Sequence, residues 1–458
     1  MGCKRLAAGR PSISTKLTFL MEATVMNQLP PDDSERALLH NEVHARPSAR
    51  IRIPAFILLV GVFNDGISRE QECEHLRQLQ PDLSLQDMQG NFIRLRMNGY
   101  TLKWERHTEF TRYSLVQSLP ENAALGSQEP ELLSHLMLPR GWLEAIPGKT
   151  FSAIKLVMLN EDLTDPQLAL DQARKWIGDA PVIASRMGNP AHSLVATDFK
   201  LRDSGFERIL VLAPHGTSQS RAGRISQRLL ELETYRLMAL RGLSVAKVVS
   251  SHLGQAEKEL SDIIDYLAHK DCDDQALLTR LIELAAGVER MTAGHAYRFA
   301  ATAAYDKLVS QRIAELRESP ISGTQTIGEF MKRRLSPAMA TAAATSQRMT
   351  SLSERINRAS SLLRTRVDIA TEEQNRMLLE KLTKGQELQL RLQSTVEGLS
   401  IAAISYYVVS LLLYAAKAAK AAGLAIQPEV VAGSLIPIVL WLVWGATRRI
   451  HARLNKVG

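Results

Sequence analysis

Two neighbouring stretches near the C-terminus decide the architecture: GLSIAAISYYVVSLLLYAA at residues 398–416 and VVAGSLIPIVLWLVWGAT at residues 430–447. Neither contains a charged residue, and each is close to the roughly 20 apolar residues that a membrane-spanning helix needs. Trp441 and Trp444 suit the interfacial belt of a bilayer. Two buried core helices are the alternative, although consecutive uncharged stretches of this length are rare in soluble proteins. The pattern predicts a transmembrane hairpin and a basic tail over residues 398–458.

The charges around this hairpin predict its orientation. The connection between its two helices holds only two basic residues, Lys417 and Lys420. More basic residues flank its outer ends, namely Lys381, Lys384, Arg391, Arg448, Arg449, Arg453 and Lys456. Because cytoplasmic segments carry the excess of Lys and Arg, we expect both termini and the bulk of the chain to face the cytoplasm.

A long helix is expected to lead into the hairpin. Residues 321–397 read as a stalk that becomes helical at about Thr326 and kinks at Pro337. Spacings of three and four alternate along one apolar stripe, which is typical of a coiled-coil seam: Met349, Leu352, Ile356, Ala359 and Leu363. We expect the stalk to pack against the earlier helices, against a second protomer, or both, and we expect a homo-oligomer.

The part before the stalk divides by pattern into a sheet domain and a helical domain. Within residues 215–320, which we expect to be a helical domain, the hydrophobic pattern predicts helices over 221–240, 244–269 and 274–317. Residues 26–214 predict an α+β domain. Its expected strands are 55–60, 91–97, 100–106, 109–116, 151–159, 182–187, 193–199 and 207–212, and its expected helices include 68–80 and 165–177. Residues 1–25 are expected to be a disordered or over-annotated extension.

One order of elements recurs inside the α+β domain. Residues 51–120 and 150–213 each read as a strand, a helix and three strands. Arg-Met-Asn-Gly at 96–99 is similar to Arg-Met-Gly at 186–188, about 90 residues later. A duplicated β-α-β-β-β unit explains the recurrence, and chance similarity explains it equally well.

Composition narrows the class of partner. The 458 residues carry a formal net charge of +8, which suits nucleic acid or an anionic membrane surface. No basic run is interleaved with aromatic residues, so we expect a membrane and no nucleic acid. Cys3, Cys73 and Cys272 are scattered, which indicates neither a disulfide framework nor a zinc site and fits a reducing compartment.

The densest polar cluster contains His40, Glu42, His44 and Arg46. His40 and His44 are four residues apart and share a face on a helix. With Glu42 they have the side-chain types of a metal site, but the spacing is not that of the His-Glu-x-x-His metalloproteases. A structural hydrogen-bond network is the interpretation that we favour, and the metal stays unknown.

A second cluster contains Glu105, Arg106, His107 and Glu109. In a strand Glu105, His107 and Glu109 project to one face, where three titratable groups resemble an acid–base or metal site. A solvated strand face with cross-strand ion pairs is the other interpretation, and we favour it.

A third candidate follows the last predicted strand and opens a helix. Thr217 and Ser218 precede Arg221 and Arg224. Free N–H groups at the helix start, together with the two arginines, would suit an anion or a phosphate. Ordinary capping by Thr217 or Ser218 is the favoured alternative. No nucleophile elbow, dinucleotide-binding turn or kinase motif set is present, so an enzyme ranks last among the functional classes.

Two motifs carry a resemblance to a known family. NEVHARP at residues 41–47 and LKWERHTEF at residues 102–110 resemble a bacterial family of predicted membrane-anchored proteins that is defined only as a domain of unknown function. The resemblance covers about residues 30–450. It implies a bacterial inner-membrane protein and no particular activity or cofactor.

A weaker similarity is to the CorA-type magnesium channels, which share the order of α+β domain, stalk helix and two C-terminal spans. The Gly-Met-Asn signature of those channels is absent, and Tyr-Ala-Ala-Lys stands at 414–417 instead. Two functional hypotheses follow. The first is a membrane-tethered scaffold or sensor whose cytosolic domain binds a partner or a small anion. The alternative is an oligomeric two-span ion channel or transporter.

Overall fold

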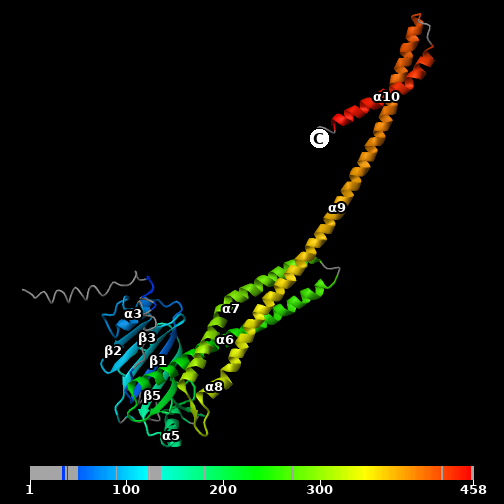
Figure 1. Ribbon diagram of the computed structural model, residues 1–458. Coiled ribbons are helices and arrows are strands. Elements are labelled where there is room, and N and C mark those ends of the chain that lie inside the picture. The colour runs from blue at the N-terminus through cyan, green and yellow to red at the C-terminus, as the bar shows by residue number, and fades with distance from the viewer. Residues whose placement is uncertain are drawn as a thin grey trace, which may run out of the picture. The chain divides into compact units, whose positions relative to one another are not determined.

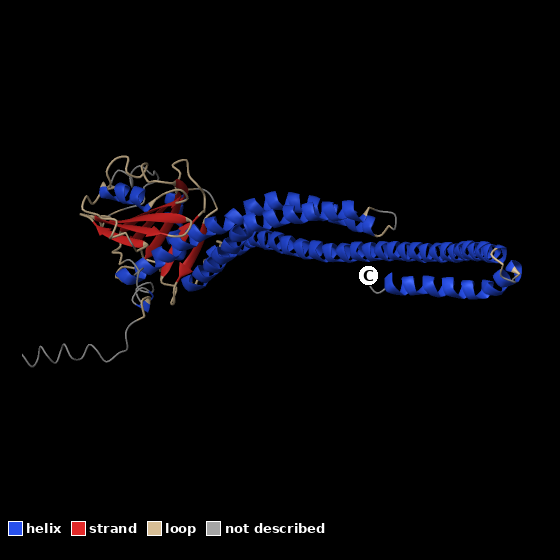
Figure 2. Cartoon of the chain, turned by 90° about the horizontal axis from the view of Figure 1, so that it is seen from above, coloured by secondary structure: helices blue, strands red, loops and turns tan. Residues whose placement is uncertain are grey.

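The computed structural model describes residues 33–36, 39, 50–88, 90–121, 123, 136–178, 181–269, 273–423 and 427–454, with side chains up to residue 449. The chain divides into two compact units: residues 1–259 with 285–354, and residues 260–284 with 355–458. The strands of the described residues all belong to the first unit. Figure 2 draws them as red arrows. A mixed α+β sheet domain followed by long helices is therefore confirmed (Figure 1).

β1 (Ala55–Phe63) lies in the middle of the sheet, and its position explains why its sequence is apolar throughout. Phe56, Leu58 and Val60 pack into the core on one face, while Ile57 and Leu59 pack into the core on the other. A strand that is buried on both faces needs an apolar residue at every position instead of an alternating pattern. The strand predicted at residues 55–60 is confirmed and extends to Phe63.

Within the described residues, nine strands form one sheet in the order β2-β3-β4-β1-β5-β8-β7-β6-β9. Each of the eight strands expected from the sequence is present, with ends that differ by a few residues at most. The bounds are Phe92–Arg96 for β2, Tyr100–Arg106 for β3, Phe110–Ser118 for β4, Lys149–Asn160 for β5, Ile183–Met187 for β6, Ser193–Thr197 for β7, Glu207–Ala213 for β8 and Ser319–Pro320 for β9.

The two segments with the recurring element order occupy the two halves of this sheet. Each places its first strand at the centre and its next strand farthest out, as β2-β3-β4-β1 and as β5-β8-β7-β6. Gly99 and Gly188, with φ of 84° and 87°, lie in equivalent turns, the first between β2 and β3 and the second between β6 and β7. However, β1 runs antiparallel to β4, whereas β5 runs parallel to β8. The halves therefore share element order and strand order but not strand direction.

Helices cover both faces of the sheet. α3 and α5 complete the core on one face through Cys73, Leu76, Leu170 and Trp176. α6, α7, α8 and the start of α9 complete it on the other face. These helices span Arg69–Arg77 for α3, Pro166–Ile177 for α5, Gln219–Leu267 for α6, Asp274–Leu316 for α7, Ile327–Arg334 for α8 and Ser336–Ala421 for α9. Side chains that cap α3 and α5 come from Ser68 and Asp165, close to the predicted helix starts.

α6 is one continuous helix of 49 residues, so the separate helices predicted at 221–240 and 244–269 were wrong. Gly242 lies in the expected gap, and a Cβ atom there would stand 2.2 Å from Thr302 Oγ1 of α7. The glycine is therefore present for the close approach of two helices, and it does not end one.

The helix predicted to kink at Pro337 is instead two helices. α8 ends at Arg334 and α9 begins at Ser336, which puts Pro337 in the first turn of α9, where its missing N–H costs nothing. All five residues of the predicted seam, from Met349 to Leu363, are buried within the single chain. Arg348 of α9 also pairs with Glu257 of α6 at 2.7 Å. This part of α9 therefore packs on the chain's own helices.

The second unit contains only helices in its described residues. Arg366 of α9 pairs with Asp274 of α7 at 3.0 Å and donates to the carbonyl oxygen of Leu267 at 2.8 Å. Beyond this point α9 is exposed along most of its length, and α10 (Pro428–Leu454) follows. Both helices contain a segment that is long and apolar enough to cross a membrane, with mean hydropathies of 1.9 and 2.0.

Candidate functional site

The first predicted cluster, His40, Glu42, His44 and Arg46, lies outside the described residues. The second and third clusters lie within the first unit, and their contacts can be followed residue by residue.

Glu105 of β3 is the centre of a buried ion cluster beneath α6. Its carboxylate lies 2.9 Å from Arg112 Nη2 and 3.2 Å from Lys103 Nζ. Burial alone would raise the pKa of Glu105, but the charges of Arg112 and Lys103 outweigh it and hold this pKa at about 2. The carboxylate therefore stays ionised near neutral pH, and it is suited to structural pairing rather than to proton donation.

Arg106, the next residue, belongs to a different network on the other face of the sheet. Its guanidinium bonds to the fully buried carboxylate of Glu72 in α3 and donates to the carbonyl oxygen of Ile67 at 2.8 Å. The Thr111 hydroxyl also donates to Glu72, at 2.6 Å. These bonds fasten the start of α3 to the end of β3.

His107 and Glu109 lie in the turn between β3 and β4. The His107 ring stacks on Phe110 with centroids 4.4 Å apart. Glu109 accepts a bond from the Arg298 guanidinium and another from the Tyr305 hydroxyl at 3.0 Å, and both partners belong to α7. Because β3 ends at Arg106, Glu105 and Glu109 are not on one continuous strand, and each carboxylate has its own basic partner.

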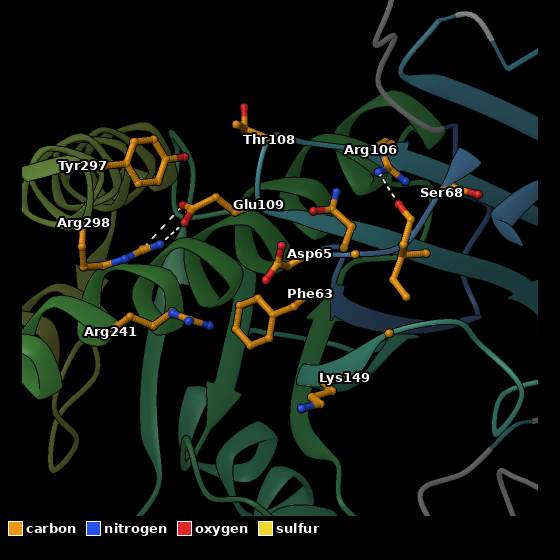
Figure 3. Close-up of a pocket in the computed structure, with 14 residues that line it drawn as sticks. Phe63, Asp65, Ser68, Arg106, Thr108, Glu109, Lys149, Arg241, Tyr297 and Arg298 are labelled. Carbon is orange, nitrogen blue, oxygen red and sulfur yellow. Dashed lines mark hydrogen bonds and ion pairs between the residues drawn. The ribbon is translucent and has the colours of Figure 1, made fainter. Parts of the chain in front are cut away.

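A large open cavity begins where these networks end, at the end of β1 (Figure 3). Its volume is about 1050 Å³. The walls come from the β1–α3 turn, the β3–β4 turn, the start of β5, and the helices α6 and α7. We call it the sheet-end cavity. Its labelled side chains in Figure 3 are Phe63, Asp65, Ser68, Arg106, Thr108, Glu109, Lys149, Arg241, Tyr297 and Arg298.

Two cations of the sheet-end cavity have no carboxylate partner among the described residues. Lys149 opens β5 and is exposed, while Arg241 lies over the Phe63 ring at 4.0 Å from its centroid. Arg106 and Arg298 are already paired with Glu72 and Glu109. The cavity is thus net basic, and it offers an aromatic ring next to a guanidinium.

The third predicted cluster lies at the start of α6. Ser218 caps α6, since its hydroxyl oxygen accepts from the Arg221 N–H at 3.4 Å. The Thr217 hydroxyl donates to the Pro214 carbonyl at 2.7 Å and lies 3.4 Å from His192 Nε2. Burial and then the Arg221 charge lower the pKa of His192. Its imidazole is therefore predominantly neutral at pH 7.

Arg221 and Arg224 both line a second cavity, of about 290 Å³, which we call the arginine cavity. His192, Arg228 and Arg317 line it as well, together with the β6–β7 turn at Gly188 and Asn189. Four arginines thus line one hollow, three from α6 and Arg317, which follows α7. All of them except Arg228 are exposed. Among the side chains that the structure describes, no group of three or more His, Cys, Asp or Glu residues could hold a metal ion.

Sequence reasoning missed Lys149, Arg241, Tyr297 and Arg298. They come from three elements that lie far apart in the chain, and none stands in a local motif. For Arg317 the one local signal was its position at the end of the predicted helix at 274–317. Only the packing of α6 and α7 on the sheet brings these groups together.

Comparison with known proteins places the chain in a family without assigning it an activity. A search of the curated proteins finds no match. The model of the family described as "Protein of unknown function (DUF3422)" matches residues 31–454. Because this match covers most of the chain, from before β1 to the end of α10, the protein belongs to the DUF3422 family.

Proposed function

We propose that this protein is anchored in a membrane and presents its sheet domain as a tethered sensor or scaffold. The observation that supports the anchor is the exposure of large apolar side chains at the end of α9 and along α10. Tyr406, Leu411, Tyr414 and Trp441 are each between 68 and 70 % exposed. Soluble proteins rarely leave contiguous apolar surface of this extent in water, whereas a lipid bilayer solvates it.

The proposed orientation puts both ends of the hairpin on the cytoplasmic side of a bacterial inner membrane. Arg448 and Arg449 follow the second apolar segment, and Lys384 and Arg391 precede the first. These two groups of cations would both remain on the side that the positive-inside rule favours.

The sheet-end cavity supports the sensor part of the proposal. It is concave and already formed, and it presents charged groups beside an aromatic ring, which together can orient a small polar molecule. Its walls include turns of the sheet as well as α6 and α7, so a ligand held there would contact both layers of the first unit. A ligand with an acidic group suits the charges of Lys149 and Arg241.

Membrane fractionation tests the anchor. The full chain should stay with the membrane pellet after extraction at alkaline pH, and a chain that ends at Glu397 should not. A variant of the full chain with Leu412→Arg and Val439→Arg is the matched control, because it keeps both helices and places charges within their apolar segments. It should extract more readily than the parent. Release of the parent chain from the pellet would contradict the proposal.

An oligomeric two-span channel is the second candidate, because the order of sheet domain, long helix and two apolar helices matches that layout. Two spans cannot enclose a hydrated pore by themselves. Light scattering of the purified protein, corrected for bound detergent, counts the protomers. Four or more would favour the channel, and one or two would leave the apolar helices as an anchor.

A further inference from the structure

The arginine cavity has features that the proposed sensor role leaves unexplained. Arg221, Arg224 and Arg228 are spaced by three and four residues, so they form a ladder on one face of α6. Arg317 approaches the same hollow from the end of α7. The question is why four cations are held around one space of about 290 Å³.

Among the residues that the structure describes, only one carboxylate lines this cavity, and it already has several donors. Glu315 accepts from Arg228 at 3.1 Å, from Arg312 at 2.9 Å and from Gln311 at 2.9 Å. Within the part of the chain that the structure describes, Arg221, Arg224 and Arg317 have no ion pair. Three guanidinium groups therefore face the cavity region without a protein anion to neutralise them.

The position of the ladder makes it electrostatically costly. The N-terminus of a helix carries a partial positive charge, which favours acidic residues and disfavours basic ones. The first turn of α6 has no acidic residue and contains Arg221, and Arg224 lies in the second turn. The like charges of the ladder also repel each other at these spacings. A bound anion would relieve both effects.

We propose that the arginine cavity binds a phosphoryl group through Arg221, Arg224 and Arg317. A guanidinium presents a planar fork of N–H donors that matches phosphate oxygens in pairs, and several forks around one hollow suit a dianion better than a single carboxylate. The hollow is large enough for inorganic phosphate or for a small phosphorylated metabolite. The inference does not depend on the membrane anchor.

The turn that carries His192 gives the site a defined wall. Because the Thr217 hydroxyl donates to Pro214, its oxygen is left to accept from His192 Nε2, 3.4 Å away. This contact ties the β6–β7 turn to the start of α6 and sets the width of the cavity between them. His192 is thus a positioning residue, and the three arginines are the binding residues.

Calorimetric titration of the full chain in a non-ionic detergent tests the proposal. Inorganic phosphate and glycerol phosphate are the two probes, at constant ionic strength in chloride buffer. One site per chain is expected for at least one probe. Tighter binding of glycerol phosphate would identify a phosphorylated metabolite as the source, and equal or tighter binding of inorganic phosphate would identify the free ion.

The double variant Arg221→Gln with Arg224→Gln should weaken that binding by about tenfold or more per arginine. Its unfolding temperature without ligand should stay the same or rise, since repulsion is removed; a merely structural pair of arginines would make it fall. The matched control is Arg333→Gln with Arg334→Gln, which removes the same charge from exposed residues of α8 and should bind as the parent does.

Two results would overturn the proposal: no binding of either probe at millimolar concentration, or equal loss of binding in the α8 control. Neither result would affect the anchor, because membrane fractionation of the same variants is read out separately.

Discussion

The sheet domain differs from the distal helices, by which we mean the end of α9 and α10, in how far its side chains are exposed to solvent. In the sheet domain even charged groups are covered: the side chains of Glu105 and Arg112 are each only 3 % exposed. In the distal helices even large apolar groups are open, with Leu411 at 69 %. β1 and residues 401–416 are both uncharged, largely apolar runs, yet the chain covers most side chains only in the first. The difference teaches that an apolar run in the sequence does not by itself show whether the chain's own fold will cover it.

The largest effect should come from breaking the buried ion cluster. Glu105→Gln leaves Arg112 and Lys103 buried without their shared anion, which should lower the free energy of unfolding by about 3–5 kcal/mol. Glu380→Gln is the matched control in the distal part of α9, where the exposed side chains of Glu380 and Lys384 form an ion pair. It should change stability by at most about 0.5 kcal/mol. Similar losses in both variants would remove the contrast between the two regions.

These measurements need a probe that reports on the sheet domain alone. Trp104, Trp142 and Trp176 are buried there, whereas Trp441 and Trp444 lie in α10. Urea unfolding followed by tryptophan fluorescence should therefore be carried out in a background with Trp441→Phe and Trp444→Phe.

Truncation of a central apolar residue should have the next largest effect. Leu58→Ala in β1 empties space in a core that cannot collapse easily, at a cost of about 2–5 kcal/mol. Leu411→Ala in α9 removes the same atoms from an exposed position, so the urea midpoint of the sheet domain should not move. A comparable shift for Leu411→Ala would show that the sheet domain and the distal helix unfold as one.

The fall in the free energy of unfolding at acid pH should depend on Glu105. Its pKa is held at about 2 in the folded state, against an ordinary value of 4.5 for a glutamate side chain. Its contribution is therefore present above about pH 4.5 and is lost as the pH falls towards 2. Unfolding free energies between pH 6 and 3 should fall more steeply for the parent than for Glu105→Gln, and parallel curves would argue against this role.

The last expected effect is on stability as the pH rises through neutrality. Burial and the neighbouring Glu233 carboxylate raise the pKa of Glu207, so the folded state retains a proton that the unfolded state releases. Stability from this group is complete below about pH 4.5 and declines as the pH rises. Glu207→Gln mimics the protonated form and should flatten the decline between pH 6 and 8. A parallel decline in both proteins would contradict this assignment.

Local patterns predicted the elements of the sheet well, because each strand and turn leaves its own mark on the sequence. The apolar run at residues 55–60 and the Asn98-Gly99 turn are examples. Strand pairing was beyond those patterns: nothing local distinguishes β1 beside β5 from β1 beside β8. Gly242, in the gap between two predicted helices, shows a related limit, since a glycine that ends a helix and one that admits Thr302 look alike in the sequence.

The candidate sites divide in the same way. Arg221 and Arg224 could be selected because they share one short motif with Ser218. Arg317, which lines the same cavity, lies far along the chain and enters only through the packing of α7. Likewise, Glu105 and Arg106 are neighbours in sequence but bond to partners on opposite faces of the sheet, since adjacent strand residues point in opposite directions.

The two halves of the sheet are joined where β1 pairs with β5, and this pairing has a consequence for synthesis on the ribosome. β1 can pair with β4 once residue 118 has emerged, but its other edge has no partner until β5, residues 149–160, has followed. During that interval the unpaired backbone N–H and C=O groups of a long apolar strand are exposed, and neighbouring nascent chains can pair with them. Slowing elongation within residues 119–148 should therefore increase aggregation of the newborn protein more than slowing it after residue 160.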